Sequence, residues 1–200
     1  MYTKKAAMFG LDARIALAIF GALSVISGAA LYGAIQDAKA TSILSDLNEI
    51  AKAAEQYYLD TGQDIPKRST DSSNWKFYSY NTTNLVTNKA GVSGWNGPYI
   101  SYKEDAGGEF LNHSSYGNVL MEFVNDDDWS ATQWEGCNTA GDKCYISVAI
   151  DGIGDASLAA KIDDKVDGGD GAGAGRFRWI TSNLSARWML FVRPAKNPKG

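Results

Sequence analysis

Histidine is almost absent from this chain, and its scarcity limits the chemistry that the protein can perform. His113 is the only histidine among 200 residues, and it lies in a polar Asn-His-Ser-Ser stretch without a nucleophile motif. General acid–base catalysis needs a side chain that is held beside its partner groups. We therefore expect a solvated loop histidine rather than a general base, and we predict that the chain is not an enzyme.

Two further signals of ligand binding are missing. The lysines and arginines are scattered and the net charge is −4, whereas nucleic-acid binding calls for a basic stripe. The glycine-rich run at residues 167–175 lacks the following Lys-Ser/Thr pair of a P-loop and does not follow a strand of a βαβ unit. The sequence thus predicts neither a nucleic-acid partner nor a nucleotide site.

Cysteine is also scarce. Cys137 and Cys144 lie close together in a stretch rich in Gly, Asn and Asp, and no other residues complete a metal site with them. A disulfide fits this pair best, and it requires an oxidising compartment, which agrees with export of the chain. The alternative is a pair of free thiols in a reducing cytosol.

A long uncharged segment follows the N-terminus. Residues 15–36 (IALAIFGALSVISGAALYGAIQ) contain no charged side chain, and a helix of that length covers about 33 Å, enough to span a bilayer. Lys4, Lys5 and Arg14 precede the segment, so the positive-inside rule places the N-terminus in the cytoplasm and the remainder outside. The alternative is a secretory signal peptide, for which residues 28–30 offer a weak cleavage site.

The helical pattern continues beyond this segment. Gly62 supplies a C-terminal cap and Pro66 prevents continuation, so we predict one helix from about residue 9 to about residue 60, roughly 75 Å long. The second half of this helix has a single apolar stripe: Ile43, Leu47, Ile50, Ala54, Tyr57 and Tyr58.

The rest of the chain is predicted to form an α+β head. Four apolar stretches separated by turn-rich segments predict an antiparallel sheet of about four strands against the long helix: GNVLMEFV, CYISVAI, GRFRWI and WMLFVR. Residues 157–166 (SLAAKIDDKV) predict a short helix. Many of the aromatic residues are expected to fill the core of this head and its contacts with other subunits.

Acidic residues are dense after the short helix. Asp163, Asp164, Asp167 and Asp170 lie in and beside the glycine-rich turn, where carboxylate and carbonyl oxygens suit calcium. The spacing of an EF-hand is absent. Calcium is the expected cofactor if there is one, and the alternative is a solvated turn whose acids discourage aggregation at a sheet edge.

The N-terminal segment resembles the type IV prepilins, a family that includes the pseudopilins of type II secretion. The resemblance rests on KKAA followed by MFGLDARIALAIF. It implies cleavage by a prepilin peptidase between Ala7 and Met8, N-methylation of Met8, and a docking role for Asp12, the fifth residue after the cut. Family members usually carry Gly before the cut and Glu at the fifth position. The alternative for Asp12 is an acid near the lipid headgroups, favoured by the helix dipole.

A second resemblance is to the major pseudopilin of type II secretion. It rests on residues 57–66 (YYLDTGQDIP) and residues 94–102 (GWNGPYISY), in the order expected for that family. We expect Trp95 and Tyr99 to pack over the long helix and residues 99–102 to begin a strand. Major pseudopilins hold calcium in a C-terminal loop, so this resemblance adds weight to a calcium site.

Together these features predict a pilin-like fold in three parts. The parts are a leader at residues 1–7, a long helix at residues 8–62 that includes the membrane segment 15–36, and an extracytoplasmic head at residues 63–200.

The resemblance implies a structural subunit that polymerises with copies of itself through the apolar helix. Its further partners would be the membrane, the prepilin peptidase and a pilus or type II secretion assembly machinery. The precursor would reside in the inner membrane, and the filament would be periplasmic or lie at the cell surface. A major pseudopilin is the alternative within this class, and a membrane-tethered extracytoplasmic binding module is the alternative from another class.

Overall fold

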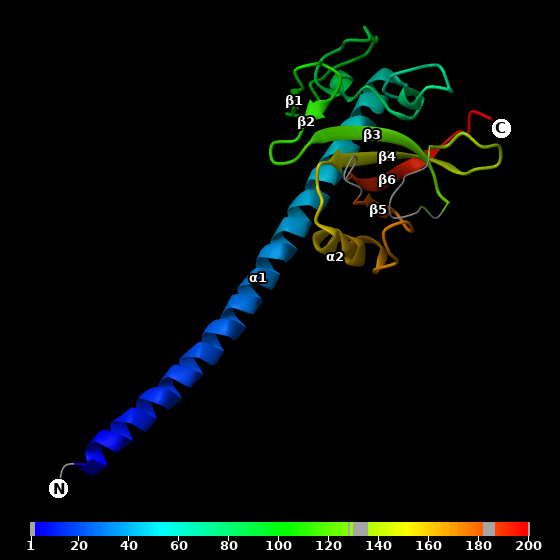
Figure 1. Cartoon of the computed structure of the whole chain (residues 1–200). Helices are drawn as coiled ribbons and strands as arrows, with labels where there is room; N and C mark the ends of the chain where they lie inside the picture. The colour runs from blue at the N-terminus through cyan, green and yellow to red at the C-terminus, as the bar shows by residue number, and fades with distance from the viewer. Residues whose placement is uncertain (1–2, 128, 130–135, 182–186, 200) are drawn as a thin grey trace. The chain divides into compact units, whose positions relative to one another are not determined.

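A computed structural model describes residues 3–127, 129, 136–181 and 187–199, and the side chains of its first helix from Gly10 onward. The chain forms two compact units, Met1–Lys39 and Ala40–Gly200. Helix α1 (Thr3–Thr61) begins in the first unit and ends in the second. Among its described residues, the second unit, here called the head, also holds one further α-helix, two short 3₁₀ helices and an antiparallel sheet, as Figure 1 shows.

The first unit is an apolar helix that other described residues of the chain leave largely uncovered. From Gly10 to Ile35 nearly every residue is exposed, including large side chains such as Leu17, Phe20 and Val25. By its length and composition α1 is able to cross a membrane, and the most apolar part of it is not buried by the described residues. Because apolar residues occupy all sides of this segment, it requires lipid or other protein chains around it. It can therefore serve as a membrane anchor.

The second part of α1 provides a single apolar stripe to the head. Ile43, Leu47 and Ile50 are buried as the periodicity predicts, and Tyr57 continues the stripe with no exposed surface. Tyr58, which was also expected on this stripe, is 44% exposed because it lies one residue further around the helix.

Helix α1 ends where the sequence indicates. Its last residue is Thr61, and the N–H of Gly62 donates to the Tyr58 carbonyl oxygen at 2.8 Å. Gly62 has a φ of 70°, a left-handed conformation that glycine adopts without steric cost.

The sheet has six strands in the order β1-β2-β3-β4-β6-β5, and all neighbouring strands are antiparallel. The strands are β1 (Lys103–Glu104), β2 (Leu111–Asn112), β3 (Asn118–Asn125), β4 (Cys144–Asp151), β5 (Phe177–Ile180) and β6 (Arg187–Ala195). The four predicted strands correspond to β3, β4, β5 and β6. The sequence missed β1 and β2 because two-residue strands are too short to show alternation.

One predicted strand is wrong. Residues 99–102 are not in a strand, because the N–H of Tyr99 donates to the carbonyl oxygen of Leu85 at 2.8 Å instead of joining a ladder. Leu85 belongs to the short 3₁₀ helix η2 (Thr82–Leu85), which follows η1 (Trp75–Tyr78). The expected packing of Tyr99 on the long helix is confirmed, since its ring contacts that of Tyr57 edge-on at 5.7 Å.

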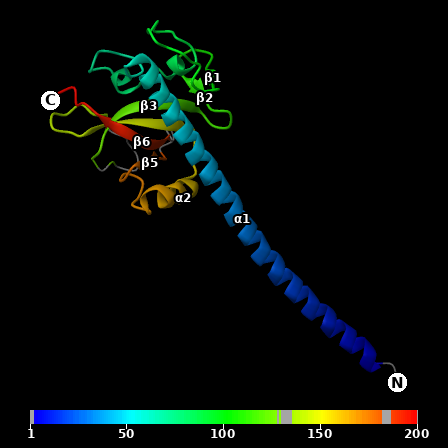
Figure 2. The ribbon, with the colours of Figure 1, turned by 180° about the vertical axis from the view of Figure 1, so that it is seen from behind.

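Alternating side chains give the sheet two apolar faces. The first face packs in one cluster with α1 and α2 through Val119, Met121, Phe123, Ile146, Val148, Ile150, Trp188 and Leu190. The opposite face carries a smaller cluster: Leu120, Val124, Trp129, Ala149, Met189 and Phe191. Within the head, α1 crosses a single face of the sheet and lies behind it in Figure 1 and in front of it in Figure 2.

Helix α2 (Ala156–Asp167) begins and ends with standard caps. The side chain of Asp155 accepts hydrogen bonds from the N–H groups of Ser157 and Leu158, each at 3.1 Å. Gly168 ends the helix in a left-handed conformation, with φ of 75°. The buried side of α2 joins the first-face cluster through Leu158, Ala159 and Ile162. The predicted short helix is therefore present, and it directs Asp163 and Asp167 into the turn that follows.

Packing of α1 on the sheet should carry much of the stability of the head. Leu47 is fully buried, so Leu47→Ala should lower the free energy of unfolding by about 2–5 kcal/mol through lost contacts and a cavity. Urea unfolding followed by tryptophan fluorescence would measure this loss. Lys52→Ala, at an exposed site on the same helix, should change stability little. Equal unfolding midpoints for the two variants would contradict this view of the core.

Candidate functional site

The predicted processing site lies in the first turns of α1. Ala7 and Met8 are helical, but their side chains lie outside the described residues, so cleavage between them stays a prediction. Asp12 is exposed on α1, and no cation pairs with it among the side chains that the structure describes. A carboxylate within an apolar helix is unfavourable in a nonpolar environment unless it gains a partner.

Three of the four predicted acidic ligands come together after α2. Oxygen atoms from the carboxylates of Asp163, Asp167 and Asp170 all lie within 4.8 Å of one another. Asp164 is exposed and lies outside this group, because the next position on α2 faces away from the buried side. We call Asp163, Asp167 and Asp170 the acidic triad.

Asp163 is the buried member of the acidic triad, with only 2% of its surface exposed. One carboxylate oxygen accepts a hydrogen bond from the N–H of Gly171 at 3.0 Å. The other oxygen, Oδ1, has no hydrogen-bond donor among the described residues. Burial raises the pKa of Asp163, and the negative charges of Asp170 and Asp167 raise it further. A cation placed between these groups would relieve both effects.

The turn between α2 and β5 holds the carboxylate of Asp167 in place and leaves room for that of Asp170. One oxygen of Asp167 accepts hydrogen bonds from the N–H groups of Arg176 at 2.8 Å and Phe177 at 2.7 Å. Gly175 has a φ of +67°, and a Cβ atom there would lie 2.5 Å from an oxygen of Asp170. A side chain at Gly175 would therefore displace the carboxylates. Glycine at this position allows the acids to converge.

The chemistry of the acidic triad suits a divalent cation. Calcium prefers carboxylate and carbonyl oxygens in flexible turns, and the triad offers three carboxylates. Two other acids near α2 serve different purposes. Asp155 caps α2, and Asp151 accepts hydrogen bonds from the backbone and side chain of Asn118. The residues that could hold calcium are therefore Asp163, Asp167 and Asp170.

The two cysteines lie within disulfide distance. Cys137 and Cys144 are buried and joined by a disulfide, with their Cα atoms 5.5 Å apart. Cys144 is the first residue of β4, and the N–H of Cys137 donates to the carbonyl oxygen of Phe123 in β3. The link therefore closes the connection between two central strands.

His113 is buried, so the expectation of a solvated loop histidine is wrong. Its Nδ1 accepts a hydrogen bond from the N–H of Ser115 at 3.1 Å, and its Nε2 lies 3.2 Å from Oδ2 of Asp46. This pattern assigns the proton to Nε2, and it leaves neither ring nitrogen free to act as a base. The polar local sequence concealed the burial, because Asp46 on α1 and the ring of Tyr102 are distant in sequence.

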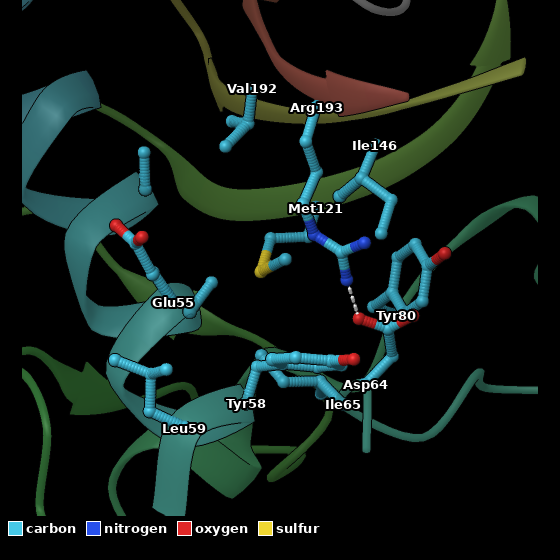
Figure 3. A pocket seen from close by; sticks show the side chains of 12 residues that line it. Glu55, Tyr58, Leu59, Asp64, Ile65, Tyr80, Met121, Ile146, Val192 and Arg193 are labelled. Carbon is cyan, nitrogen blue, oxygen red and sulfur yellow. Dashed lines mark hydrogen bonds and ion pairs between the residues drawn. The ribbon is translucent and has the colours of Figure 1, made fainter. Parts of the chain in front are cut away.

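A pocket of about 380 Å³ lies between the end of α1 and the sheet within the head (Figure 3). The side chain of Arg193 extends over it, with its guanidinium paired to Asp64 and 5.1 Å from the ring centroid of Tyr58. Both members of this ion pair are more than one-third exposed, so solvent screens their attraction. The remaining lining is mostly apolar: Ala51, Ala54, Leu59, Ile65, Met121, Ile146 and Val192 among others.

Sequence analysis missed a buried carboxylate on β3. Glu122 is 1% exposed and lies between Leu120 and Val124 on the second face of the sheet. Arg187, at the start of β6, donates a hydrogen bond to its Oε1. Burial raises the pKa of Glu122 to about 7, an effect that Arg187 opposes and Asp151 reinforces. The available signal was a single acid inside an otherwise apolar strand.

The raised pKa of Glu122 predicts a pH-dependent stability. The folded chain retains a proton on Glu122 up to about pH 7, whereas the unfolded chain loses it near 4.5. The contribution of Glu122 to stability therefore decreases as pH rises through this window. The free energy of unfolding of the wild type should fall relative to that of Glu122→Gln between about pH 5 and about pH 8, as measured by urea titrations.

Glu55→Gln provides the control for this measurement, because Glu55 is exposed and belongs to no ion pair among the described residues. Its difference from the wild type should stay constant with pH. A constant difference for Glu122→Gln as well would contradict the assignment.

Comparison with known proteins found no relative: no family model, no curated protein and no solved structure matches this chain.

Proposed function

We propose that this chain is a non-enzymatic structural subunit of a type IV pilus-like filament. It is held in the inner membrane by the apolar part of α1 and then polymerises with copies of itself through that segment. The proposal follows from the resemblance to the prepilins and from the properties of α1, taken together.

The observation that carries this proposal is the difference in burial between the two parts of α1. Its apolar residues are exposed on all sides as far as Ile35, and from Ala40 onward a single stripe is buried in the head. An ordinary membrane anchor needs about 20 residues and has no reason to continue as the core of a folded head. A filament subunit uses the first segment for contacts with its neighbours and the second to carry its head.

Asp12 supplies the polar contact in this proposal. Cleavage between Ala7 and Met8 creates a new amino group, and the carboxylate of Asp12 pairs with that group on a neighbouring subunit. Both charges are unfavourable in an apolar bundle when alone, and their pairing removes much of that penalty. Repeated association through different surfaces of each copy, with a rotation that does not close, yields a filament rather than a ring.

The acidic triad favours a second candidate within the same class, the major pseudopilin of a type II secretion system. That family carries calcium in a C-terminal loop, and here three carboxylates converge after α2 with a buried oxygen lacking a donor. In this version of the proposal Asp163, Asp167 and Asp170 hold calcium and order the turn, and the filament acts in secretion.

Substitution of Asp12 tests the filament proposal. Asp12→Ala should abolish filaments while the amount of protein in the membrane fraction stays unchanged, because insertion depends on the apolar segment alone. Asp12→Glu is the matched control and should assemble, since it preserves the charge. Negative-stain microscopy of sheared surface fractions and mass spectrometry of the subunit's N-terminus measure the outcome in cells that carry the assembly machinery.

Filaments formed by Asp12→Ala at the wild-type level would remove the docking role. Mass spectrometry should find Met8 as the methylated N-terminal residue, and deletion of residues 1–7 should prevent assembly while leaving a stable membrane protein. A wild-type chain that forms no filaments yet binds a ligand at the cell surface would instead support the membrane-tethered binding module.

Calcium binding tests the second candidate. Isothermal titration of the EDTA-treated wild type with calcium chloride should show binding that weakens by about tenfold or more in Asp163→Asn. Asp164→Asn is the matched control, because it removes the same charge one residue away from the acidic triad. Affinity should also fall as pH decreases, since burial and the neighbouring acids raise the pKa of Asp163 and protons then compete with calcium.

Equal affinities for the Asp163→Asn and Asp164→Asn variants would show that calcium is not held by the acidic triad. Absence of calcium binding in the wild type would indicate that the turn is only solvated, and it would remove the support for the secretion pseudopilus. Neither result would bear on assembly through α1.

A further inference from the structure

A second hollow of the head lies beside the middle of α1, away from the acidic triad. Its volume is about 470 Å³, which is within the usual range of small-molecule sites. One wall comes from α1 and the other from the segments around β1 and β2. The lining residues are Ser42, Asp46, Glu49, Ile100, Ser101, Tyr102, His113, Ser114, Ser115 and Tyr116. We call this hollow the tyrosine pocket.

The charge of the tyrosine pocket is negative. Asp46 and Glu49 are three residues apart on α1, so both carboxylates lie on one side of the helix. The lining contains no lysine or arginine, and both ring nitrogens of His113 are engaged in hydrogen bonds with Ser115 and Asp46. An anionic ligand would be repelled, and a cation would be attracted by both carboxylates.

Aromatic rings form the second feature of this pocket. Tyr102 and Tyr116 are half-buried, and their ring centroids lie 5.5 and 4.9 Å from that of His113. Burial raises the pKa of Tyr102 to about 12, and the charges of Asp46 and Glu49 contribute, so its phenol is neutral at physiological pH. Faces of neutral tyrosine rings attract cations and provide apolar surface for methyl or methylene groups.

The same residues disfavour a bare metal ion. Asp46 directs an oxygen to the Nε2–H of His113, and both nitrogens of the histidine are engaged. Glu49 is exposed and is then the only carboxylate without a described partner in the pocket. A divalent metal needs several oxygen or nitrogen ligands close around it. A larger cation with an apolar shell needs fewer polar ligands: one or two carboxylates and an aromatic surface are sufficient to bind it.

We propose that the tyrosine pocket binds an organic ammonium cation, with Glu49 and Asp46 balancing its charge and with Tyr102 and Tyr116 contacting its alkyl groups. The hydroxyl groups of Ser42 and Ser101 lie in the lining and are available to polar atoms of the ligand. This site is independent of filament assembly, since it uses only residues of the head.

Ligand-observed NMR titration of the full-length chain in maltoside micelles provides the test. A phosphocholine detergent would compete for the site and must be avoided. The probes are choline, tetramethylammonium and Nα-acetyl-lysine amide, and sucrose is the neutral control. We expect saturable binding of at least one ammonium probe at millimolar concentration and no saturable binding of sucrose.

The probes also distinguish the source of the cation. Saturation by choline and tetramethylammonium identifies a quaternary ammonium as the ligand. Saturation by the lysine derivative alone identifies a primary ammonium of the kind found on protein side chains. Either result supports the proposal, whereas binding of sucrose without any ammonium probe overturns it in favour of a sugar site.

Two pairs of variants locate the binding. Glu49→Gln should weaken binding by roughly two- to fivefold, and Glu55→Gln, an equal charge change at another exposed site on α1, should leave it unchanged. Tyr116→Phe retains the aromatic face and should bind as the wild type does, whereas Tyr116→Leu should lose a similar factor.

Far-ultraviolet circular dichroism would confirm that the head of the Tyr116→Leu variant remains folded. Glu49 is exposed, so the result for Glu49→Gln does not depend on that control. The proposal is overturned if no ammonium probe saturates the wild type. It is equally overturned if Glu49→Gln and Glu55→Gln weaken binding to the same extent, because the effect would then be one of overall charge.

Discussion

Water cannot solvate a helix that is apolar on all sides without a large unfavourable free energy, and this constraint explains the use of α1 along its length. As far as Ile35 the helix exposes leucine, isoleucine, valine and phenylalanine side chains that require lipid or protein contacts. From Ala40 onward the same requirement is met within the chain, because the stripe through Ile43, Leu47 and Ile50 is buried by the head. The apolar residues in the C-terminal part of α1 are thus buried by the head of the same chain. Those in the N-terminal part need lipid or other protein chains to bury them.

Several polar side chains of the head are buried by this apolar packing and have few hydrogen-bond partners within reach. Glu122 is enclosed on the second face of the sheet and relies on Arg187. His113 is enclosed beside α1 and relies on Asp46. Asp163 is enclosed on the inner side of α2, and only one of its two oxygens has a donor among the described residues. Glu122 and Asp163 each keep one carboxylate oxygen without a donor among the described residues, but Glu122 has the cationic Arg187 beside it, whereas Asp163 has two further acids and gains most from a cation.

Helical periodicity was sufficient to predict α1, and apolar stretches between turns were sufficient to predict the strands β3, β4, β5 and β6, which have four residues or more; the short helix α2 was also predicted. Such patterns failed for β1 and β2, which have two residues each, and for residues 99–102, where the N–H of Tyr99 donates to Leu85 instead of to a neighbouring strand. Among the acids near the turn, sequence density pointed to Asp163, which lies in the acidic triad, and also to Asp164, which does not, since density cannot tell which side of α2 is buried. The surroundings of His113 and Glu122 come from distant parts of the chain and left little local signal.

In the turn after α2, the acids and the glycines should differ in how well they tolerate substitution. An acid in the triad can become the corresponding amide with little effect on backbone conformation, because the two side chains have nearly the same shape. Gly168 and Gly175 have φ values of +75° and +67°, and an L-residue there costs about 1–2 kcal/mol. A deep mutational scan that selects for folding alone would therefore tolerate the amide at an acid of the triad better than a side chain at these glycines. Over evolutionary time the shape of the turn would persist in homologues that have lost the charges it presents.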